Sequence, residues 1–317
     1  ISVRDGSIAA VFRLQARGGE FLREPHRAAE LAQHGGDPAC RITPSALCEM
    51  GRKLAPAKMR QCVMKPVKVL VQQHAAQPER PTVATHAYTV APGYLEIETG
   101  AQDTRPASVT QFIAPVVVKI GVVPRLQLEI QGGYSRASGF GSTVSGAMDL
   151  AVALKQRILD DAPILHDFSV QGNIKFPTGA TDVTTKTTDA SLLLISSRPL
   201  GAAELDLNIG YTRRSGDGSI APINATLATA SFGTPISGPL GAVAELFSYP
   251  ATSGPAGTAT SIGFLFGPTY QVRPWIVLDA GAILNVRNMT ANSIYAGLTY
   301  NVGRIPGFPG SRENLTR

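Results

Sequence analysis

Six prolines recur at nearly even spacing through most of the chain, and each precedes a strand-like run. The intervals between successive prolines are 32, 39, 36, 40 and 35 residues. Each interval accommodates two strands of about ten residues, one loop and one tight turn. Proline suits such turns because its φ is fixed and it gives a sheet no ladder donor. The prolines are Pro92, Pro124, Pro163, Pro199, Pro239 and Pro274.

Polar and apolar residues alternate within these runs, most regularly over residues 204–212. A period of two places each set on one face of a sheet. No convincing amphipathic helix separates the runs, so they are consecutive antiparallel hairpins. We expect one set of this run to face lipid, namely Leu205, Leu207, Ile209 and Tyr211. The other set, Glu204, Asp206 and Asn208, then faces the lumen.

Six hairpins predict an all-β fold, an up-and-down antiparallel transmembrane β-barrel of twelve strands over residues 82–305. The proline-bearing turns are short, whereas the opposite loops are longer and rich in Gly, Ser, Thr and Asp. Short periplasmic turns with longer external loops are typical of barrels in the bacterial outer membrane, which is the expected location. A soluble β-sandwich, whose strands also alternate, remains the alternative fold.

The first 81 residues differ from the rest and show no strand rhythm. Residues 1–80 contain 13 Lys and Arg against 7 Asp and Glu, whereas residues 81–317 contain 16 of each. We expect residues 1–81 to be a disordered extension or a targeting remnant, and residues 306–317 to be a polar C-terminal tail. Cys40, Cys48 and Cys62 match no zinc spacing and no basic patch is patterned, so neither a metal nor a nucleic-acid partner is predicted.

Carboxylates follow each proline by four to seven residues. If all six strands rise from the periplasmic side, these residues form an acidic belt in the lower lumen: Glu96, Glu98, Glu129, Asp167, Glu204, Asp206, Glu245 and Asp279. The opposite strand ends predict a basic external mouth of Arg136, Lys175, Arg213, Arg214 and Arg287. Such a mouth would concentrate anions such as aromatic carboxylates, because charged clefts focus the local field. Simple solvation of a water-filled interior explains the same charges equally well.

Two lysines are expected to partner this belt inside the lumen. Reflecting the chain about Pro124 puts Lys119 opposite Glu129, and reflection about Asp161 puts Lys155 opposite Asp167. Opposite residues of an antiparallel pair share a face, so both pairs should attract.

The last strand, residues 293–302, contains Gly297 followed by hydrophobic residues at +3 and +5. This pattern looks like the closing-strand signal that the bacterial barrel-assembly machinery reads, so that machinery is an expected partner.

Four segments carry a family resemblance: residues 88–102, 117–130, 173–179 and 295–300. They are similar to the strands of a bacterial outer-membrane transporter family named for the meta-cleavage pathway of phenol degradation. The resemblance covers about residues 82–305. It implies an outer-membrane barrel associated with uptake of small, often aromatic compounds, and it supplies no catalytic residues.

The predicted function is therefore a passive channel for small solutes, whose partners are membrane lipid and a small molecule. A structural or adhesive barrel with a plugged lumen is the alternative. No cofactor and no enzymatic activity are expected. In particular, His166 and Ser169 are spaced for opposite sides of a strand, which does not suit a Ser–His pair.

Overall fold

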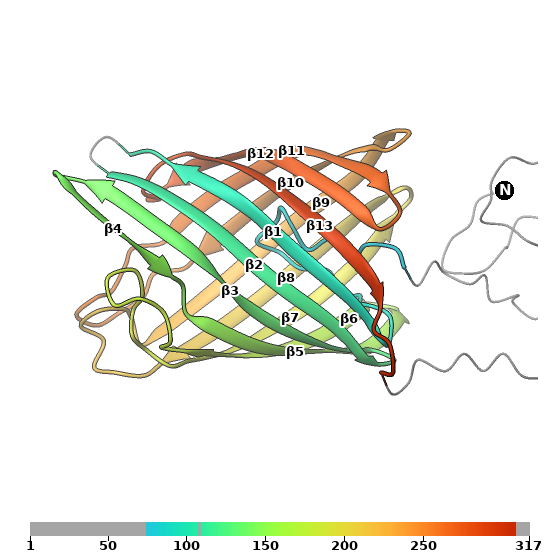
Figure 1. Ribbon diagram of the computed structural model, residues 1–317, viewed down its shortest axis with the longest axis horizontal. Helices are drawn as coiled ribbons and strands as arrows, with labels where there is room; N and C mark the ends of the chain where they lie inside the picture. Colours follow the sequence, from blue (N-terminus) through green and yellow to red (C-terminus); the bar gives the residue numbers. More distant parts are fainter. Residues whose placement is uncertain (1–73, 107–108, 309–317) are drawn as a thin grey trace, which may run out of the picture. The chain divides into compact units, whose positions relative to one another are not determined.

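The computed structural model describes residues 74–106 and 109–308. Their strands form one antiparallel sheet that closes on itself, because β2 pairs with both β1 and β3 (Figure 1). The strands are β1 (Tyr94–Thr104), β2 (Val109–Val123), β3 (Leu126–Gly139), β4 (Ser142–Ala147), β5 (Leu150–Ala162), β6 (His166–Phe176), β7 (Asp189–Leu200), β8 (Ala203–Arg214), β9 (Asn224–Ser237), β10 (Leu240–Tyr249), β11 (Ser261–Arg273), β12 (Ile276–Arg287) and β13 (Ser293–Arg304).

The strands β4 and β5 together form one position of the wall. One half of β3, Tyr134–Gly139, pairs with β4, and the other half, Leu126–Gln131, pairs with β5. The structure is therefore a closed barrel of 12 strands, which confirms the predicted fold and excludes the sandwich. Within residues 74–106 and 109–308, no helix is long and apolar enough to cross a membrane, a result that bears only on helices.

Each of the six prolines precedes a strand that starts at the same end of the barrel. The chain enters and leaves the wall there, since Tyr94 at the start of β1 pairs with Arg304 at the end of β13. Short turns join strands at this end, as between β2 and β3, whereas residues 177–188 and 250–260 form longer loops at the other end. We call the short-turn end periplasmic, as in other bacterial barrels.

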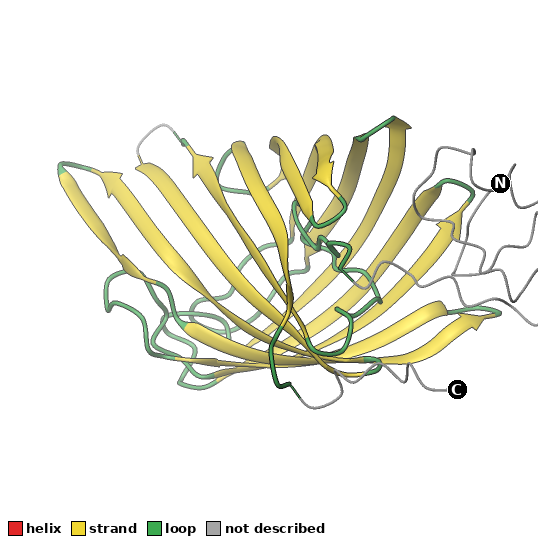
Figure 2. Cartoon of the chain, turned by 45° about the vertical axis from the view of Figure 1, so that its right-hand side comes forward, coloured by secondary structure: helices red, strands yellow, loops and turns green. Residues whose placement is uncertain are grey.

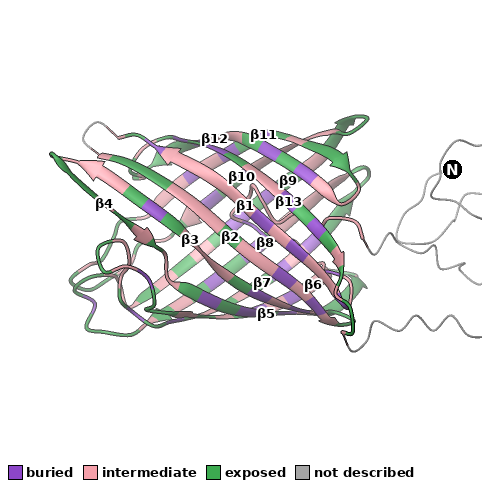
Figure 3. Cartoon of the chain, viewed as in Figure 1, coloured by how far each residue is buried: buried purple, intermediate pink, exposed green. Residues whose placement is uncertain are grey.

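The wall presents polar side chains to the interior and apolar side chains to the outside, which is the reverse of the arrangement in a soluble protein. Along β8, Asn208 is 1% exposed, whereas Leu207 and Ile209 are 45% and 66% exposed. Figure 3 shows the same alternating bands of buried and exposed residues on most strands. The predicted register of residues 204–211 is thus confirmed. The largest fully buried side chains include Lys119 and Lys155.

Only one of the two predicted cross-strand registers is found, and neither predicted ion pair is among those of the described residues. Lys119 is the Cα partner of Glu129, as expected. The pairing of Lys155 with Asp167 was wrong, because register shifts near Arg157 and Leu159 displace the hairpin, and Gln171 faces Lys155 instead.

Residues 74–92 run inside the barrel, where Figure 2 shows an irregular loop enclosed by the strands. We call this stretch the luminal segment. The sequence predicts residues 1–81 to be a disordered extension or a targeting remnant, and the structure places residues 74–81 of this range in the luminal segment. The expected start of the barrel at residue 82 also falls within this segment. The predictions for residues 1–73, with all three cysteines, and for 309–317 concern residues outside the described part of the chain.

Candidate functional site

The luminal segment enters the barrel at the periplasmic rim, beside the turn between β11 and β12. The ring of His74 stacks on Trp275 with 5.2 Å between ring centroids, and its Nε2 donates to the carbonyl of Asn301 at 2.8 Å. The amide of Ala76 donates to the carbonyl of Pro274 at 2.8 Å. These contacts fix the point of entry.

Wall carboxylates then accept the backbone N–H groups of the segment. The backbone amide of Gln77 donates to the carboxylate of Glu96 at 2.7 Å. The backbone amide of Glu79 donates to the carboxylate of Glu98, also at 2.7 Å. Lys119 lies 2.6 Å from each of these two wall carboxylates. An irregular chain inside a barrel has no strand ladder, so its amides need such side-chain partners.

The side chain of Glu79 reaches a second wall strand, where it forms an ion pair with Lys155 of β5. Burial opposes ionisation of Glu79, but the charges of Lys119 and Lys155 outweigh it and hold the pKa of Glu79 well below its usual range. Burial, together with the charge of Lys155, lowers the pKa of His86 to about 3, so this imidazole is neutral at pH 7.

Between Glu79 and Ala84 the segment passes from β1 to β10. We call residues 79–84 the crossing. At its far end, the backbone amides of Val83 and Ala84 both donate to the carboxylate of Glu245, each at 2.7 Å. The three strands β11, β12 and β13 separate β10 from β1 in the wall, so the crossing spans a wide sector of the lumen.

The segment returns along the opposite side of the lumen. Thr85 donates to the Asn208 side chain at 2.7 Å and accepts from it at 2.9 Å. Ala87 donates to Ser197 at 2.7 Å, and Val90 donates to Gln127 at 2.7 Å. The segment therefore follows a loop around the interior and reaches the wall at β8, β7 and β3 in turn.

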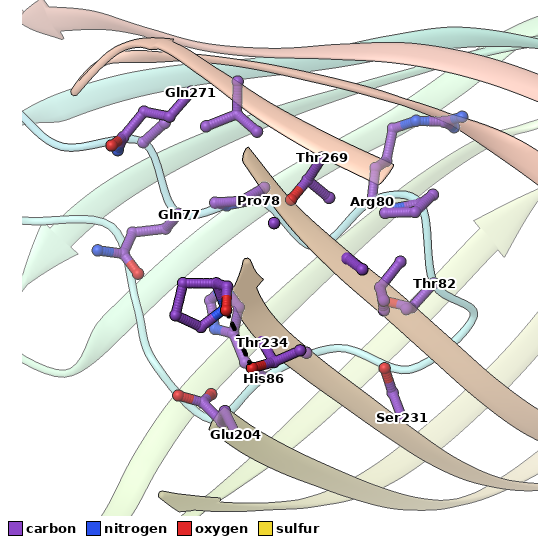
Figure 4. A pocket seen from close by; sticks show the side chains of 18 of the residues that line it. Gln77, Pro78, Arg80, Thr82, His86, Glu204, Ser231, Thr234, Thr269 and Gln271 are labelled. Atoms are coloured by element: carbon purple, nitrogen blue, oxygen red, sulfur yellow. Dashed lines mark hydrogen bonds between the residues drawn. The ribbon is translucent and has the colours of Figure 1, made fainter. Parts of the chain in front are cut away.

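A cavity of about 430 Å³ lies between the luminal segment and the wall formed by β8 to β12. Figure 4 shows Gln77, Pro78, Arg80 and Thr82 along one limb of the segment and His86 on the returning limb. The turn residues Ala202 and Gly238 also border this cavity, which places it at the periplasmic end.

The charged groups of the cavity wall are mainly acidic. Glu204 accepts a hydrogen bond from the Tyr88 hydroxyl at 3.3 Å, and Asp206 accepts one from Ser197 at 2.5 Å. Among the described residues, no ion pair involves Glu204, Asp206 or Glu245.

Arg80 also borders the cavity, but its guanidinium lies in a notch of the wall. A Cβ atom at Gly100 would lie 2.5 Å from its Nη2, and one at Gly297 would lie 2.6 Å from its Nε. The same Cβ at Gly297 would lie 2.7 Å from a carboxylate oxygen of Asp279. The two glycines thus make room for Arg80 beside Asp279.

Apolar side chains fill part of the lumen next to the crossing. Phe247, Leu265, Ile283 and Tyr295 form a buried cluster, against which Val83 of the crossing packs. Phe247 follows Glu245 on the same face of β10, toward the external end. The crossing and this cluster together occupy the sector above the cavity.

The predicted acidic belt faces the interior, but most of it binds protein groups. Glu96, Glu98 and Glu245 accept amides of the segment. Glu129 accepts from glutamines of β3 and β6, and Asp167 pairs with Arg157 at 2.8 Å. Sequence reasoning had not anticipated the luminal segment. A surplus of inward carboxylates over lysines was the available signal, because buried carboxylates need donors.

The predicted basic mouth is not assembled. Lys175 lies 2.7 Å from Asp149, and Arg214 lies 3.3 Å from Asp189, so both charges are neutralised locally. The alternation of β3 and β8 puts Arg136 and Arg213 on the outer face. Arg287 is exposed at the external end of β12.

The apolar outer face, polar interior and closed 12-stranded wall define a bacterial outer-membrane β-barrel. The chain belongs to the family described as "Putative MetA-pathway of phenol degradation", which matches residues 79–302. The family expected from the four sequence segments is thereby confirmed.

Two solved structures are similar to parts of this chain. The COG4313 outer membrane channel from Pseudomonas putida F1 is similar with a TM-score of 0.55 and 14% identity, covering 67% of this chain and 97% of that chain. A NanC porin has a TM-score of 0.44 and 13% identity, covering 65% of this chain and 98% of that chain. No curated protein matches the sequence.

Proposed function

We propose that the protein is a passive outer-membrane channel for small solutes. The cavity of about 430 Å³ beside the luminal segment is the observation that carries this proposal, because it provides room for a small solute within the lumen. The similar structure from Pseudomonas putida F1 is itself named an outer membrane channel, which supports the same function.

We propose neutral phenol-type compounds as the solutes, in preference to aromatic carboxylates. The family description refers to phenol degradation. The cavity combines apolar groups such as Val243 and Val277 with the hydroxyl groups of Thr82 and Thr234, a lining that suits a hydroxylated ring. The carboxylates of Glu204 and Asp206 disfavour anions in the same cavity, whereas they do not repel a neutral phenol.

A barrel with a plugged lumen is the second candidate. The crossing and the apolar cluster at Phe247 favour it, since both occupy the lumen next to the cavity. This barrel would serve as a structural or adhesive element without solute flux.

Planar-bilayer recording on the purified full chain tests the proposal. A channel gives discrete conductance steps, and a plugged barrel that is correctly folded gives none. Phenol and benzoate have the same ring and differ in charge, so they form a matched pair of added solutes. Phenol should reduce the ion current at lower concentration than benzoate; the reverse order would contradict the proposed solute class.

A further inference from the structure

Glu245 of β10 connects the channel wall to the far end of the crossing through a single side chain. The carboxylate of Glu245 accepts hydrogen bonds from two consecutive backbone amides, each at 2.7 Å. The amide of Val83 donates to Oε2 and the amide of Ala84 donates to Oε1. Glu245 is 1% exposed, and the amide groups that it accepts belong to the part of the crossing farthest from β1.

We propose that the crossing, residues 79–84, is the barrier to permeation and that Glu245 is the positioning residue that holds it across the lumen. This inference rests on the proposed channel function and names the residue that controls it. The crossing borders the cavity through Arg80, Pro81 and Thr82, so a displacement of the crossing changes the boundary of this cavity.

The two ends of the crossing are held differently. At the β1 end, Glu98 accepts the Glu79 amide, and Lys119 lies 2.6 Å from Glu98. The Glu79 side chain adds its ion pair with Lys155. At the β10 end, the amides of Val83 and Ala84 meet Glu245, which has no ion pair among the described residues.

This difference makes the β10 end the releasable one. Charge-assisted hydrogen bonds to a carboxylate are roughly twice as strong as neutral ones, so loss of the Glu245 charge weakens both contacts together. The β1 end keeps its lysine partners whether or not Glu245 is charged. Loss of the Glu245 contacts therefore lets Val83 and Ala84 move away from β10, while the segment stays anchored at β1 through Glu79 and at β8 through Thr85.

Glu245→Gln is the first test, because it removes the charge and keeps the shape. The side-chain amide nitrogen cannot accept, so at most one oxygen remains for the two backbone donors. Val83→Pro is an independent second variant, since it removes one of the two donors from the segment and leaves the wall unchanged. Heat-modifiable gel mobility verifies that each variant folds.

Glu129→Gln is the matched control. Glu129 is also a buried luminal carboxylate, 1% exposed, and the substitution changes the charge equally. Its hydrogen bonds go to Gln127, Gln131 and Gln171 of the wall and to no residue of the luminal segment. A conductance change that came from luminal charge alone would therefore occur in this variant as well.

The measurement is single-channel conductance of the full chain in a planar bilayer. We expect Glu245→Gln and Val83→Pro to raise the unitary conductance by about twofold or more, and Glu129→Gln to leave it near the wild-type value, because conductance follows the narrowest section.

Three results decide between the proposals. If the wild type conducts and neither crossing variant differs from it, the inference is overturned and the channel function stands. If the wild type is silent while Glu245→Gln conducts, the crossing is the barrier and the wild-type barrel is plugged. If every folded variant is silent, both proposals fail.

Discussion

Lys155 of β5 forms an ion pair with Glu79 of the luminal segment, although 76 residues separate them in the chain. The Nζ of Lys155 also donates to the carbonyl of His86 on the returning limb at 3.2 Å. One wall lysine therefore contacts both limbs of the segment. Its side chain is fully buried, so the contact lies inside the lumen and not at a rim.

Lys155→Met should weaken docking of the luminal segment. Removing Lys155 takes away one of the two lysine charges that balance the buried carboxylate of Glu79, and breaking a buried ion pair costs up to about 3–5 kcal/mol. The expected result is faster hydrogen exchange at the amides of Gln77 and Glu79, whereas the wall strands stay protected. Adding Glu79→Gln to Lys155→Met removes the stranded charge and should recover part of the protection. Equal exchange in the single and double variants would contradict the pairing.

The stability of the docked segment should depend on pH through His86. Burial and Lys155 lower its pKa from 6.5 to about 3 in the folded state. The unfolded chain then binds more protons between these two values, so stability is present above pH 6.5 and is lost as pH falls toward 3. At pH 5 the loss is about 2 kcal/mol at most.

Urea unfolding in lipid vesicles between pH 7 and pH 5 measures this effect. His86→Gln lacks the titrating ring and should show a flatter pH profile over that range. Glu79 contributes its own pH dependence only at lower pH, because its folded pKa lies below its usual value of 4.5. An identical slope in wild type and His86→Gln would refute the assignment to His86.

The outer face of β8 gives a prediction about the membrane. Leu207 is 45% exposed on the apolar face, so Leu207→Arg places a charge in lipid. The expected cost is about 2–4 kcal/mol if the position lies near the bilayer midplane. Leu207→Phe keeps the position apolar and serves as the control. Unfolding in vesicles measures both, and equal stability of the two variants would mean that this face does not contact lipid.

The wall of the barrel could be predicted from the sequence because strand alternation and short turns depend only on residues that are close together in the chain. Alternation assigned Leu207 and Asn208 to opposite faces, and a short turn let Lys119 be placed opposite Glu129. The same procedure failed for Lys155, because register shifts beside Arg157 cannot be seen in the alternation.

The luminal segment could not be predicted from strand alternation or turn length, for a different reason. Its irregular backbone has no periodicity, and its partners are wall side chains far away in sequence, such as Glu245, which is 162 residues from Val83. Three carboxylates of the expected belt, Glu96, Glu98 and Glu245, accept backbone amides of the segment. Alternation placed these carboxylates on the inner face of the wall but carried no sign of the segment that they contact.

Ion selectivity should depend on Glu204 and Asp206, the carboxylates of the cavity that have no ion pair among the described residues. A permeation path with acidic walls concentrates cations, so the wild-type channel should prefer cations in a salt gradient. Glu204→Gln combined with Asp206→Asn should shift the reversal potential toward zero. The shift should be largest at low salt, where screening is weakest. Arg213→Glu is the matched control, because Arg213 lies on the outer face of the same strand and its reversal should leave selectivity unchanged. A reversal potential that responds to Arg213 and not to the two carboxylates would place the selective section at the external mouth instead.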